Sequence, residues 1–230
     1  MSIIYSDFLL DMLRARRVFL FDLDSTLVKT EWSYILAILR QVIKNCGGRV
    51  FPEVDMLEAF WVGNGIPRDD FIKSALKIKP TDFWREYHHL DLPESRLTRT
   101  SVISGVENNL NLLNDNGKLL GIVTAAYPAL AQAEAGLINV TFDSVLSVSM
   151  HPELRPKPAP DGLLWSMEQL GCSQDETIYV GDSAEDYAFA MAAGVDFIHY
   201  QHHGVMLFYG QQEQPLANFD NWHKSPFLVM

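Results

Sequence analysis

The clearest feature of the chain is a series of short apolar runs, each separated from the next by a segment with helical spacing. The first run, residues 18–21 (VFLF), is apolar on both faces, as is typical of a strand buried in a parallel sheet. Further runs at 119–123, 144–148, 177–180 and 196–200 follow helical segments at 106–114, 128–135, 161–170 and 184–193. This alternation predicts an α/β fold with a doubly wound parallel sheet and right-handed crossovers. A further helix is expected over residues 3–15.

Residues 28–98 break this alternation. Their apolar side chains recur at helical spacing and suggest no strand, and glycine and proline residues divide the segment into several short helices. We therefore expect a helical domain at 28–98 inserted into a core made of residues 1–27 and 99–230. The last thirty residues, rich in Gln, His and aromatic side chains, show no clear period, and we expect them to be partly ordered at best.

Composition narrows the classes of function. The net charge of −11, without a Lys/Arg run to offset it, argues against a nucleic-acid partner. No apolar run reaches the roughly 18 residues of a membrane span. The basic residues near the N-terminus follow the apolar stretch rather than precede it, so we expect no export signal. With two cysteines, Cys46 and Cys172, we expect reduced thiols in a cytoplasmic protein.

Candidate chemistry gathers where the expected strands end. The carboxyl ends of parallel strands meet at one edge of an open sheet, and such folds bind their ligands there. The polar residues that follow the strands are Asp22, Asp24, Ser25 and Thr26, then Thr124, then Lys157 in the loop after the third strand, then Asp182 and Asp186. Several carboxylates at one site repel one another unless a cation joins them, and hard oxygen ligands favour Mg²⁺. Carboxylates, Mg²⁺ and a lysine together would form a binding site for a phosphoryl group.

These residues, in this order, resemble the haloacid-dehalogenase-like superfamily. Within it, they resemble the phosphoglycolate phosphatase-like branch, whose helical cap is inserted after the first motif. Asp22-Leu-Asp24-Ser-Thr26 is similar to the first motif, Asp-x-Asp-x-Thr, and Thr124 to the second. Lys157, in Lys-Pro-x-Pro, is similar to the third, and Gly181-Asp182-Ser-x-x-Asp186 to the fourth. The resemblance covers residues 18–200 or so and implies a Rossmann-like core with a cap domain.

The resemblance also implies roles for the acidic residues. Asp22 would attack phosphorus and form an aspartyl phosphate. Asp24 would protonate the leaving oxygen and then activate the hydrolytic water. Mg²⁺ would be held by Asp22, the backbone carbonyl of Asp24 and Asp182, with Asp186 steadying the magnesium waters or Lys157 from behind.

The remaining motif residues would contact the substrate, expected to be a small phosphorylated metabolite. Thr124 and Lys157 would hold phosphoryl oxygens. Ser25, Thr26 and the backbone N–H of Ala125 are further candidates. Related phosphoglycolate phosphatases usually carry Asn and Lys after the second-motif threonine, whereas here Ala125 and Ala126 follow it, which puts phosphoglycolate in doubt as the substrate. Arg68 would reach a substrate from the cap, although a surface charge is the commoner role for such a residue.

Other functions share part of this pattern. A hexose phosphomutase uses the same aspartyl phosphate but returns the phosphoryl group to the sugar, and the motifs do not exclude it. A catalytically idle scaffold is a further alternative, although every expected catalytic group is present. A receiver-type domain has no room for an insertion of about seventy residues after its first strand. Dehalogenation needs neither Asp24 nor Asp182. The sequence leaves the oligomeric state open.

Overall fold

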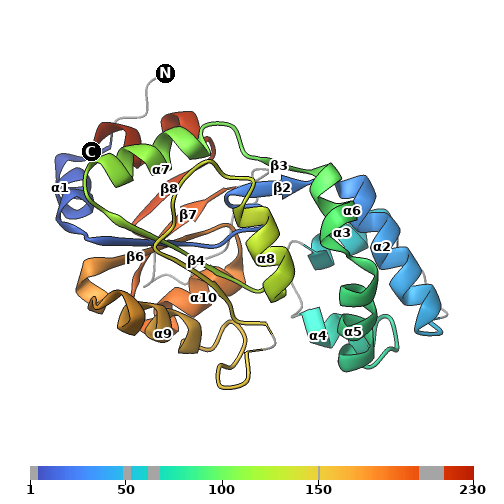
Figure 1. The fold of residues 1–230 in the computed structure, drawn as a ribbon. Coiled ribbons are helices and arrows are strands. Elements are labelled where there is room, and N and C mark those ends of the chain that lie inside the picture. The colour runs from blue at the N-terminus through green and yellow to red at the C-terminus, as the bar shows by residue number, and fades with distance from the viewer. Residues whose placement is uncertain (1–4, 49–52, 62–67, 150, 202–214) are drawn as a thin grey trace. The chain divides into compact units, whose positions relative to one another are not determined.

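A six-stranded parallel sheet forms the framework of the larger part of the molecule (Figure 1). The computed structural model describes residues 5–48, 53–61, 68–149, 151–201 and 215–230. The sheet has the order β5-β4-β1-β6-β7-β8. Its strands are β1 (Val18–Phe21), β4 (Leu119–Thr124), β5 (Ser144–Ser147), β6 (Thr177–Gly181), β7 (Asp196–Tyr200) and β8 (Ala217–Phe219). The expected α/β fold with a parallel sheet is confirmed.

Helices cover both faces of this sheet, as a doubly wound fold requires (Figure 1). On one face, α1 (Asp7–Ala15), α7 (Val106–Asp115) and α8 (Pro128–Ala135) share a core with β1 and the C-terminal segment. On the other face lie α9 (Asp161–Leu170) and α10 (Ala184–Ala193). The chain places β4 and β5 on one side of β1 and then β6 to β8 on the other. The switch between β1 and β6 is where open α/β sheets bind ligands.

Local sequence explains where the two terminal helices of this core begin. Ser6 caps α1, since its hydroxyl accepts a hydrogen bond from Leu9 N. Ser183 caps α10 in a capping box with Asp186, three residues later. The second cap also matters for the chemistry, because it fixes Asp186 beside the end of β6.

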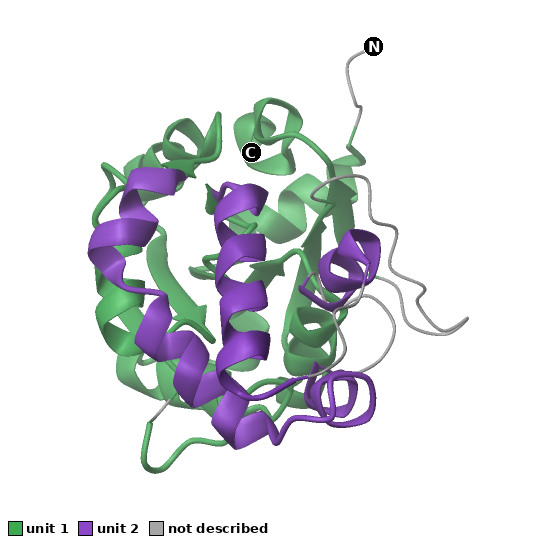
Figure 2. Ribbon diagram, turned by 90° about the vertical axis from the view of Figure 1, so that its right-hand side faces the viewer, with its two compact units in different colours: residues 1–29, 101–230 green, residues 30–100 purple. Residues whose placement is uncertain are grey.

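The chain divides into two compact units (Figure 2). Unit 1 comprises residues 1–29 and 101–230, and unit 2 residues 30–100. Unit 2 consists of α2 (Trp32–Asn45), α3 (Val54–Trp61), α4 (Arg68–Ser74), α5 (Pro80–Leu90), α6 (Pro93–Arg96) and the 3₁₀ helix η1 (Leu97–Arg99). These helices bury a core of their own, in which Phe60 lies 4.9 Å from Phe71 and 5.9 Å from Phe83, measured between ring centroids.

One expectation from the sequence was wrong. A strand does occur between residues 28 and 98, because β2 (Val28–Thr30) pairs with β3 (Thr100–Val102) in a two-stranded sheet. Three residues are too few to produce a recognisable period in the sequence. The Thr30 and Thr100 hydroxyls, 2.8 Å apart, hold the two strands together where the chain passes between the units.

The end of the chain was expected to be partly ordered at best. Residues 202–214 lie outside the described residues, whereas residues 215–230 form regular elements. They form the edge strand β8 and the 3₁₀ helices η4 (Trp222–Lys224) and η5 (Pro226–Val229). Another 3₁₀ helix, η2 (Gln174–Glu176), precedes β6. Phe219, Trp222 and Phe227 are buried in the core of unit 1.

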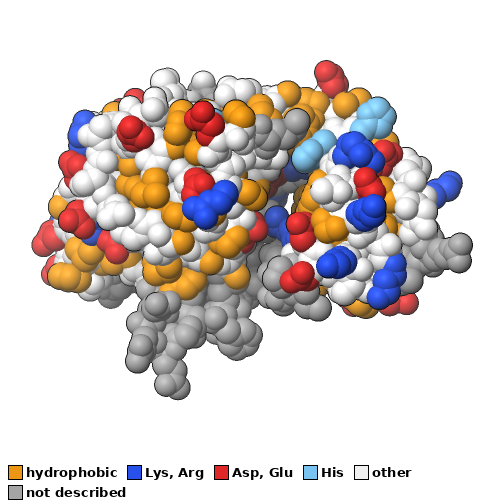
Figure 3. Space-filling view, turned by 90° about the horizontal axis from the view of Figure 1, so that it is seen from below, with side chains coloured by type: hydrophobic (Ala, Val, Ile, Leu, Met, Phe, Trp, Pro, Cys, Tyr) orange, Lys and Arg blue, Asp and Glu red, His pale blue; other side chains and the backbone are white. Residues whose placement is uncertain are grey.

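The distribution of charged side chains and the character of the helices bear on possible partners. Among the described side chains visible in Figure 3, lysines and arginines are scattered among acidic and apolar residues and do not gather into one basic patch. In the described part of the chain, every helix is too short or too polar to cross a lipid bilayer.

Candidate active site

The turn after β1 carries the first group of candidate residues. Asp22 directly follows β1, is only 7% exposed, and is held at the sheet because its backbone N–H donates to Val180 O in β6 at 2.9 Å. The chain then turns sharply. Ser25 has a φ of +63°, its N–H donates to Val28 O, and the N–H groups of Leu27 and Val28 donate to Leu23 O. Asp24, half-buried, lies within this turn and bridges to Val28.

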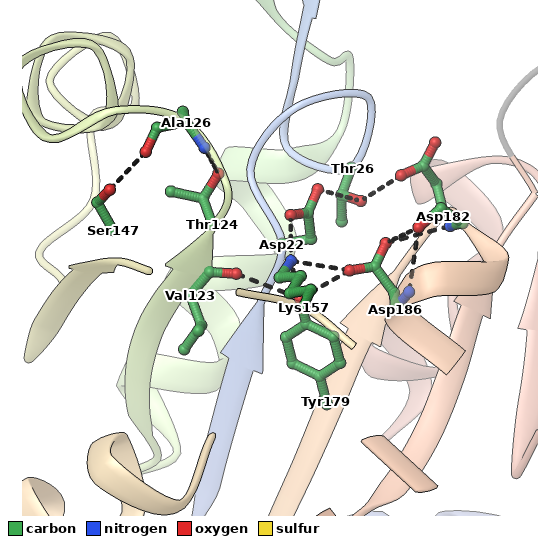
Figure 4. Close-up of polar contacts among 11 residues, drawn as sticks. Asp22, Thr26, Val123, Thr124, Ala126, Ser147, Lys157, Tyr179, Asp182 and Asp186 are labelled. Atoms are coloured by element: carbon green, nitrogen blue, oxygen red, sulfur yellow. Dashed lines mark hydrogen bonds and ion pairs between the residues drawn. The ribbon is translucent and has the colours of Figure 1, made fainter. Parts of the chain in front are cut away.

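Lys157 is the centre of the buried polar network (Figure 4). Its ammonium donates to Asp22 Oδ1 at 2.7 Å, to Asp186 Oδ1 at 2.8 Å and to the Tyr179 hydroxyl at 2.6 Å. All three donor positions of the ammonium are therefore used. Lys157 is 6% exposed, so these contacts lie out of water and define its position. The loop lysine expected from the sequence is thus a member of the buried site.

Tyr179 is a member of the site that sequence analysis missed. It lies in the middle of β6, and its hydroxyl is 2.9 Å from Asp186 Oδ1 and 3.2 Å from Val123 O. The sequence shows it as one more large residue in an apolar strand. A buried tyrosine hydroxyl needs a polar partner, however, and a tyrosine two residues before Gly181-Asp182 was a signal that the strand reaches the site.

Asp186 is fixed on every side. Its Oδ2 accepts the Ser183 hydroxyl at 2.6 Å and the Ser183 N–H at 3.2 Å, while Oδ1 accepts from Lys157. Gly181 makes room for it, since a Cβ placed on Gly181 would lie 2.6 Å from the Asp186 Cβ and Cγ. A side chain at residue 181 would therefore displace the carboxylate that orients Lys157.

Thr26 and Asp182 complete the polar cluster. The Thr26 hydroxyl lies 3.4 Å from Asp22 Oδ2 and 3.3 Å from Asp182 Oδ1, longer than ordinary hydroxyl hydrogen bonds, so it spans the two carboxylates without a short bond to either. The backbone of Asp182 is supported from β7. His199 is fully buried, and its Nε2 lies 3.2 Å from Asp182 O. Burial lowers the pKa of His199 and so favours its neutral form.

The charges in this cluster influence one another strongly. Burial raises the pKa of Asp22 to about 7, against the opposing effect of Lys157 and together with that of Asp186. Burial also works to raise the pKa of Asp186, but Lys157 outweighs it and holds that pKa below its usual value. For Lys157, burial is outweighed by Asp186 and Asp22, and the pKa is raised. These shifts favour the protonated lysine and the ionised Asp186 carboxylate, which form an ion pair.

The carboxylates of the cluster are placed so that they could bind a divalent cation. Carboxylate oxygens of Asp22, Asp182 and Asp186 all lie within 4.8 Å of one another. Three acids thus lie close together while the buried ammonium is bonded to two of them, Asp22 and Asp186, and a second source of positive charge would balance the cluster. Both oxygens of Asp186 already accept hydrogen bonds from Lys157 and Ser183, which suits a supporting role better than direct coordination. The all-oxygen donor set is the kind that Mg²⁺ favours.

The other three candidates from the sequence are Thr124, Ala125 and Arg68. Thr124, at the end of β4, is 1% exposed, and its hydroxyl accepts the Ala126 N–H at 3.1 Å (Figure 4). Ala125, next to it, is exposed. Arg68 belongs to unit 2, where its guanidinium donates to Trp61 O at 2.9 Å and lies 5.9 Å from the centre of the Trp61 ring. This contact with Trp61 was not predicted from the sequence.

Comparisons with known proteins agree with the fold. A sequence model of the haloacid dehalogenase-like hydrolase family matches residues 19–200. Phosphoglycolate phosphatase of Pseudomonas fluorescens is 28% identical over 229 residues, which are 94% of this chain and 77% of the relative. Pyrophosphatase PpaX of Bacillus velezensis is 29% identical over 185 residues, which are 76% of this chain and 78% of the relative.

A solved structure extends the likeness to the whole fold. The crystal structure assigned to a haloacid dehalogenase-like hydrolase of Bacteroides fragilis superposes with a TM-score of 0.72 at 22% identity, covering 90% of this chain and 97% of that one. The chain belongs to the haloacid dehalogenase-like hydrolase family. The resemblance inferred from the four motifs is confirmed, as is the assignment to an enzyme class with phosphatase relatives.

Proposed function

We propose that this protein is a Mg²⁺-dependent phosphohydrolase that cleaves a small phosphomonoester through an aspartyl phosphate on Asp22. The observation that carries the proposal is the buried cluster at the switch point between β1 and β6. There Asp22 lies against Lys157, with the carboxylates of Asp182 and Asp186 beside it. The curated relatives with phosphatase and pyrophosphatase names support the same class of reaction.

The proposed reaction has two steps. In the first, a carboxylate oxygen of Asp22 attacks phosphorus, the bond from phosphorus to the leaving oxygen breaks, and Asp24 gives its proton to that oxygen. In the second, Asp24 takes a proton from water, the water oxygen attacks phosphorus, and the bond to Asp22 breaks. Inorganic phosphate leaves, Asp22 is again a carboxylate, and Asp24 is again protonated.

The other residues of the cluster would orient and balance these steps. Lys157 holds one oxygen of Asp22 at 2.7 Å, so the other oxygen would be the one aimed at phosphorus. Asp186 and Tyr179 hold the Lys157 ammonium from behind and would keep it in place as charge moves. Thr124 and the N–H of Ala125 would receive phosphoryl oxygens at the end of β4. Asp22, Asp182 and the Asp24 carbonyl would hold Mg²⁺, which would shield the nucleophile from its anionic target.

The proposed substrate is a small phosphorylated metabolite whose identity would be read by unit 2. Phosphoglycolate should be tested but is not the substrate we expect. Ala125 and Ala126 lack the side chains that usually follow the second-motif threonine in phosphoglycolate phosphatases. We propose a cytoplasmic location, which agrees with Cys46 and Cys172 being present without a disulfide.

Phosphate release from a substrate panel tests the proposal. The panel should contain sugar phosphates, nucleotides, phosphoglycolate, pyrophosphate and an aryl phosphate, each with Mg²⁺ and with EDTA. Asp22→Asn removes the nucleophile, and Asp115→Asn, an exposed residue at the end of α7, is the matched control. We expect metal-dependent release that disappears only in Asp22→Asn. Sugar isomerisation without net release would instead indicate a phosphomutase, and no reaction at all would indicate a scaffold.

A further inference from the structure

The C-terminal segment contacts the loop that carries the candidate nucleophile. Trp222, at the start of η4, is fully buried. Its indole N–H donates a hydrogen bond to the backbone carbonyl of Thr26 at 3.1 Å, in buried surroundings. The two residues are separated by 196 positions in the sequence. The hydrogen bond therefore ties the end of the chain to the turn between Asp22 and Val28.

The indole ring also packs against the strand that precedes this turn. Its ring lies 6.3 Å from that of Phe21, the residue directly before Asp22, and 5.7 Å from that of Tyr200 at the end of β7. One side chain thus contacts the chain just before Asp22 through its ring and the chain at Thr26 through its N–H. The segment between those two points contains Asp22, Asp24 and Ser25, whose positive φ marks a sharp turn.

Trp222 is itself held tightly in place. Asn109 in α7 donates to Trp222 O at 2.9 Å and to Gly105 O at 2.7 Å. Gly105 has a φ of +92°, and a Cβ placed there would lie 3.0 Å from the Trp222 Cβ. The glycine therefore allows the backbone before α7 to approach the tryptophan closely. A polar anchor and a close backbone contact leave the indole little freedom to move.

We propose that Trp222 is a positioning residue for the active-site loop, and that its N–H sets the place of Asp24 and Thr26 relative to Asp22. The proposal rests on the proposed function for its kinetic meaning, but its structural content concerns the loop alone. Trp222 lies beyond residue 200, where the match to the family model ends, so the contact is not part of the matched motifs. Thr26 transmits the effect, because its carbonyl accepts from Trp222 while its hydroxyl spans Asp22 and Asp182.

Trp222→Phe is the first test, since it keeps an aromatic ring and removes the N–H. We expect kcat to fall by about 10- to 100-fold, because displacements on the order of 1 Å in an active site can cost that much. KM should change little, since ground-state binding does not depend on this loop alone. Phe227→Leu is the matched control: Phe227 packs 6.0 Å from Trp222 and 5.6 Å from Phe19, and no hydrogen bond to the loop is lost.

The kcat of the wild type and of both variants is measured well below the melting temperature of each protein and is normalised to the amount of folded protein. Wild-type kcat in Trp222→Phe would overturn the proposal, and so would an equal loss in Phe227→Leu. If Trp222→Phe does not fold, 3-benzothienylalanine incorporated at position 222 keeps the bicyclic shape and lacks the N–H. The same fall in kcat is then expected, and its absence counts against the proposal.

A second readout needs no turnover and separates this proposal from the proposed function. The N–H groups of Ser25, Thr26, Leu27 and Val28 all bond within the loop, to Val28 O or Leu23 O. Hydrogen exchange of the peptide spanning residues 22–29 should become faster in Trp222→Phe and stay unchanged in Phe227→Leu. An inactive wild type with this exchange pattern would refute the phosphohydrolase and keep the positioning role. An active wild type with unchanged hydrogen exchange in Trp222→Phe would keep the phosphohydrolase and refute the positioning role of Trp222.

Discussion

At the scale of single residues, the most consequential feature is that Asp22 is a buried carboxylate. Burial raises its pKa to about 7, while Lys157 works against this and Asp186 adds to it. A carboxyl group whose folded pKa is raised contributes stability that is present below its unfolded value near 4. That contribution is lost as the pH rises through about 7. The residue that would perform the chemistry therefore weakens the metal-free fold at neutral pH.

This gives a prediction about stability. Asp22→Asn should be more stable than the wild type in EDTA at pH 8 and nearly equal to it at pH 4. The difference in free energy of unfolding between the two proteins should be at most a few kcal/mol, because each pKa unit corresponds to about 1.4 kcal/mol. Urea unfolding at several pH values, with EDTA, measures it. Mg²⁺ should narrow the gap at pH 8 by stabilising the wild type. A gap that does not vary with pH would show that the Asp22 charge is not the cause.

Asp24 gives the second prediction at this scale, because it lies in the same turn as Asp22 but is only half-buried. Asp24→Asn should lower kcat by about 10²–10⁴, the usual range for a general acid or base. Since Asp22 remains, the variant should still accept a phosphoryl group from an activated aryl phosphate and lose it slowly. Mass spectrometry after acid quench should detect the phosphorylated chain in Asp24→Asn and not in Asp22→Asn. Wild-type turnover would remove Asp24 from its proposed role.

At the scale of secondary-structure elements, sequence and structure agree where the signal is local. The ranges 128–135, 161–170 and 184–193 were predicted as helices and are found with those bounds. The motif residues also lie at strand ends, because a buried strand followed by polar residues can be recognised within a few positions. The predictions failed where a structure depends on distant partners. Nothing near Trp222 in the sequence indicates Thr26 or Phe21, and the buried role of Tyr179 depends on Lys157, 22 residues away.

Removing the C-terminal elements should unfold unit 1. Ending the chain at residue 214 deletes β8, η4 and η5, and with them the buried side chains of Phe219, Trp222 and Phe227. Losing three large buried aromatic side chains lowers the free energy of unfolding by more than a typical domain can lose, since each large-to-small change in a core alone costs about 3–5 kcal/mol. We expect loss of the near-ultraviolet circular dichroism signal and of cooperative unfolding.

The control for this truncation is a shorter one. Removing only residues 228–230 deletes Leu228 and Val229, which are 38% and 50% exposed, and leaves Phe227 in place. This chain should keep a cooperative transition. If the long truncation also unfolds cooperatively, β8 and the 3₁₀ helices do not stabilise unit 1 as their burial indicates.

At the scale of the whole molecule, the chemistry and the proposed recognition belong to different units. Asp22, Thr124, Lys157, Asp182 and Asp186 all lie in unit 1, whereas unit 2 is a helical unit with its own core. Unit 2 also contains a buried ion pair, with 2.7 Å between Arg96 and Asp91. Each unit thus has an apolar core of its own, as an independently folding domain does.

This independence leads to the last prediction. Because β2 and β3 pair and the Thr30 and Thr100 hydroxyls are 2.8 Å apart, residues 31–99 can be replaced by a short Gly-Ser linker without stretching the chain. The shortened protein should unfold cooperatively and release phosphate from an aryl phosphate with Mg²⁺, since the proposed catalytic groups remain. It should no longer discriminate among metabolites, so kcat/KM values across the panel should converge. If it folds and still prefers the wild-type substrate, specificity resides in unit 1, and residues such as Ser25 and Ala125 become the positions to vary.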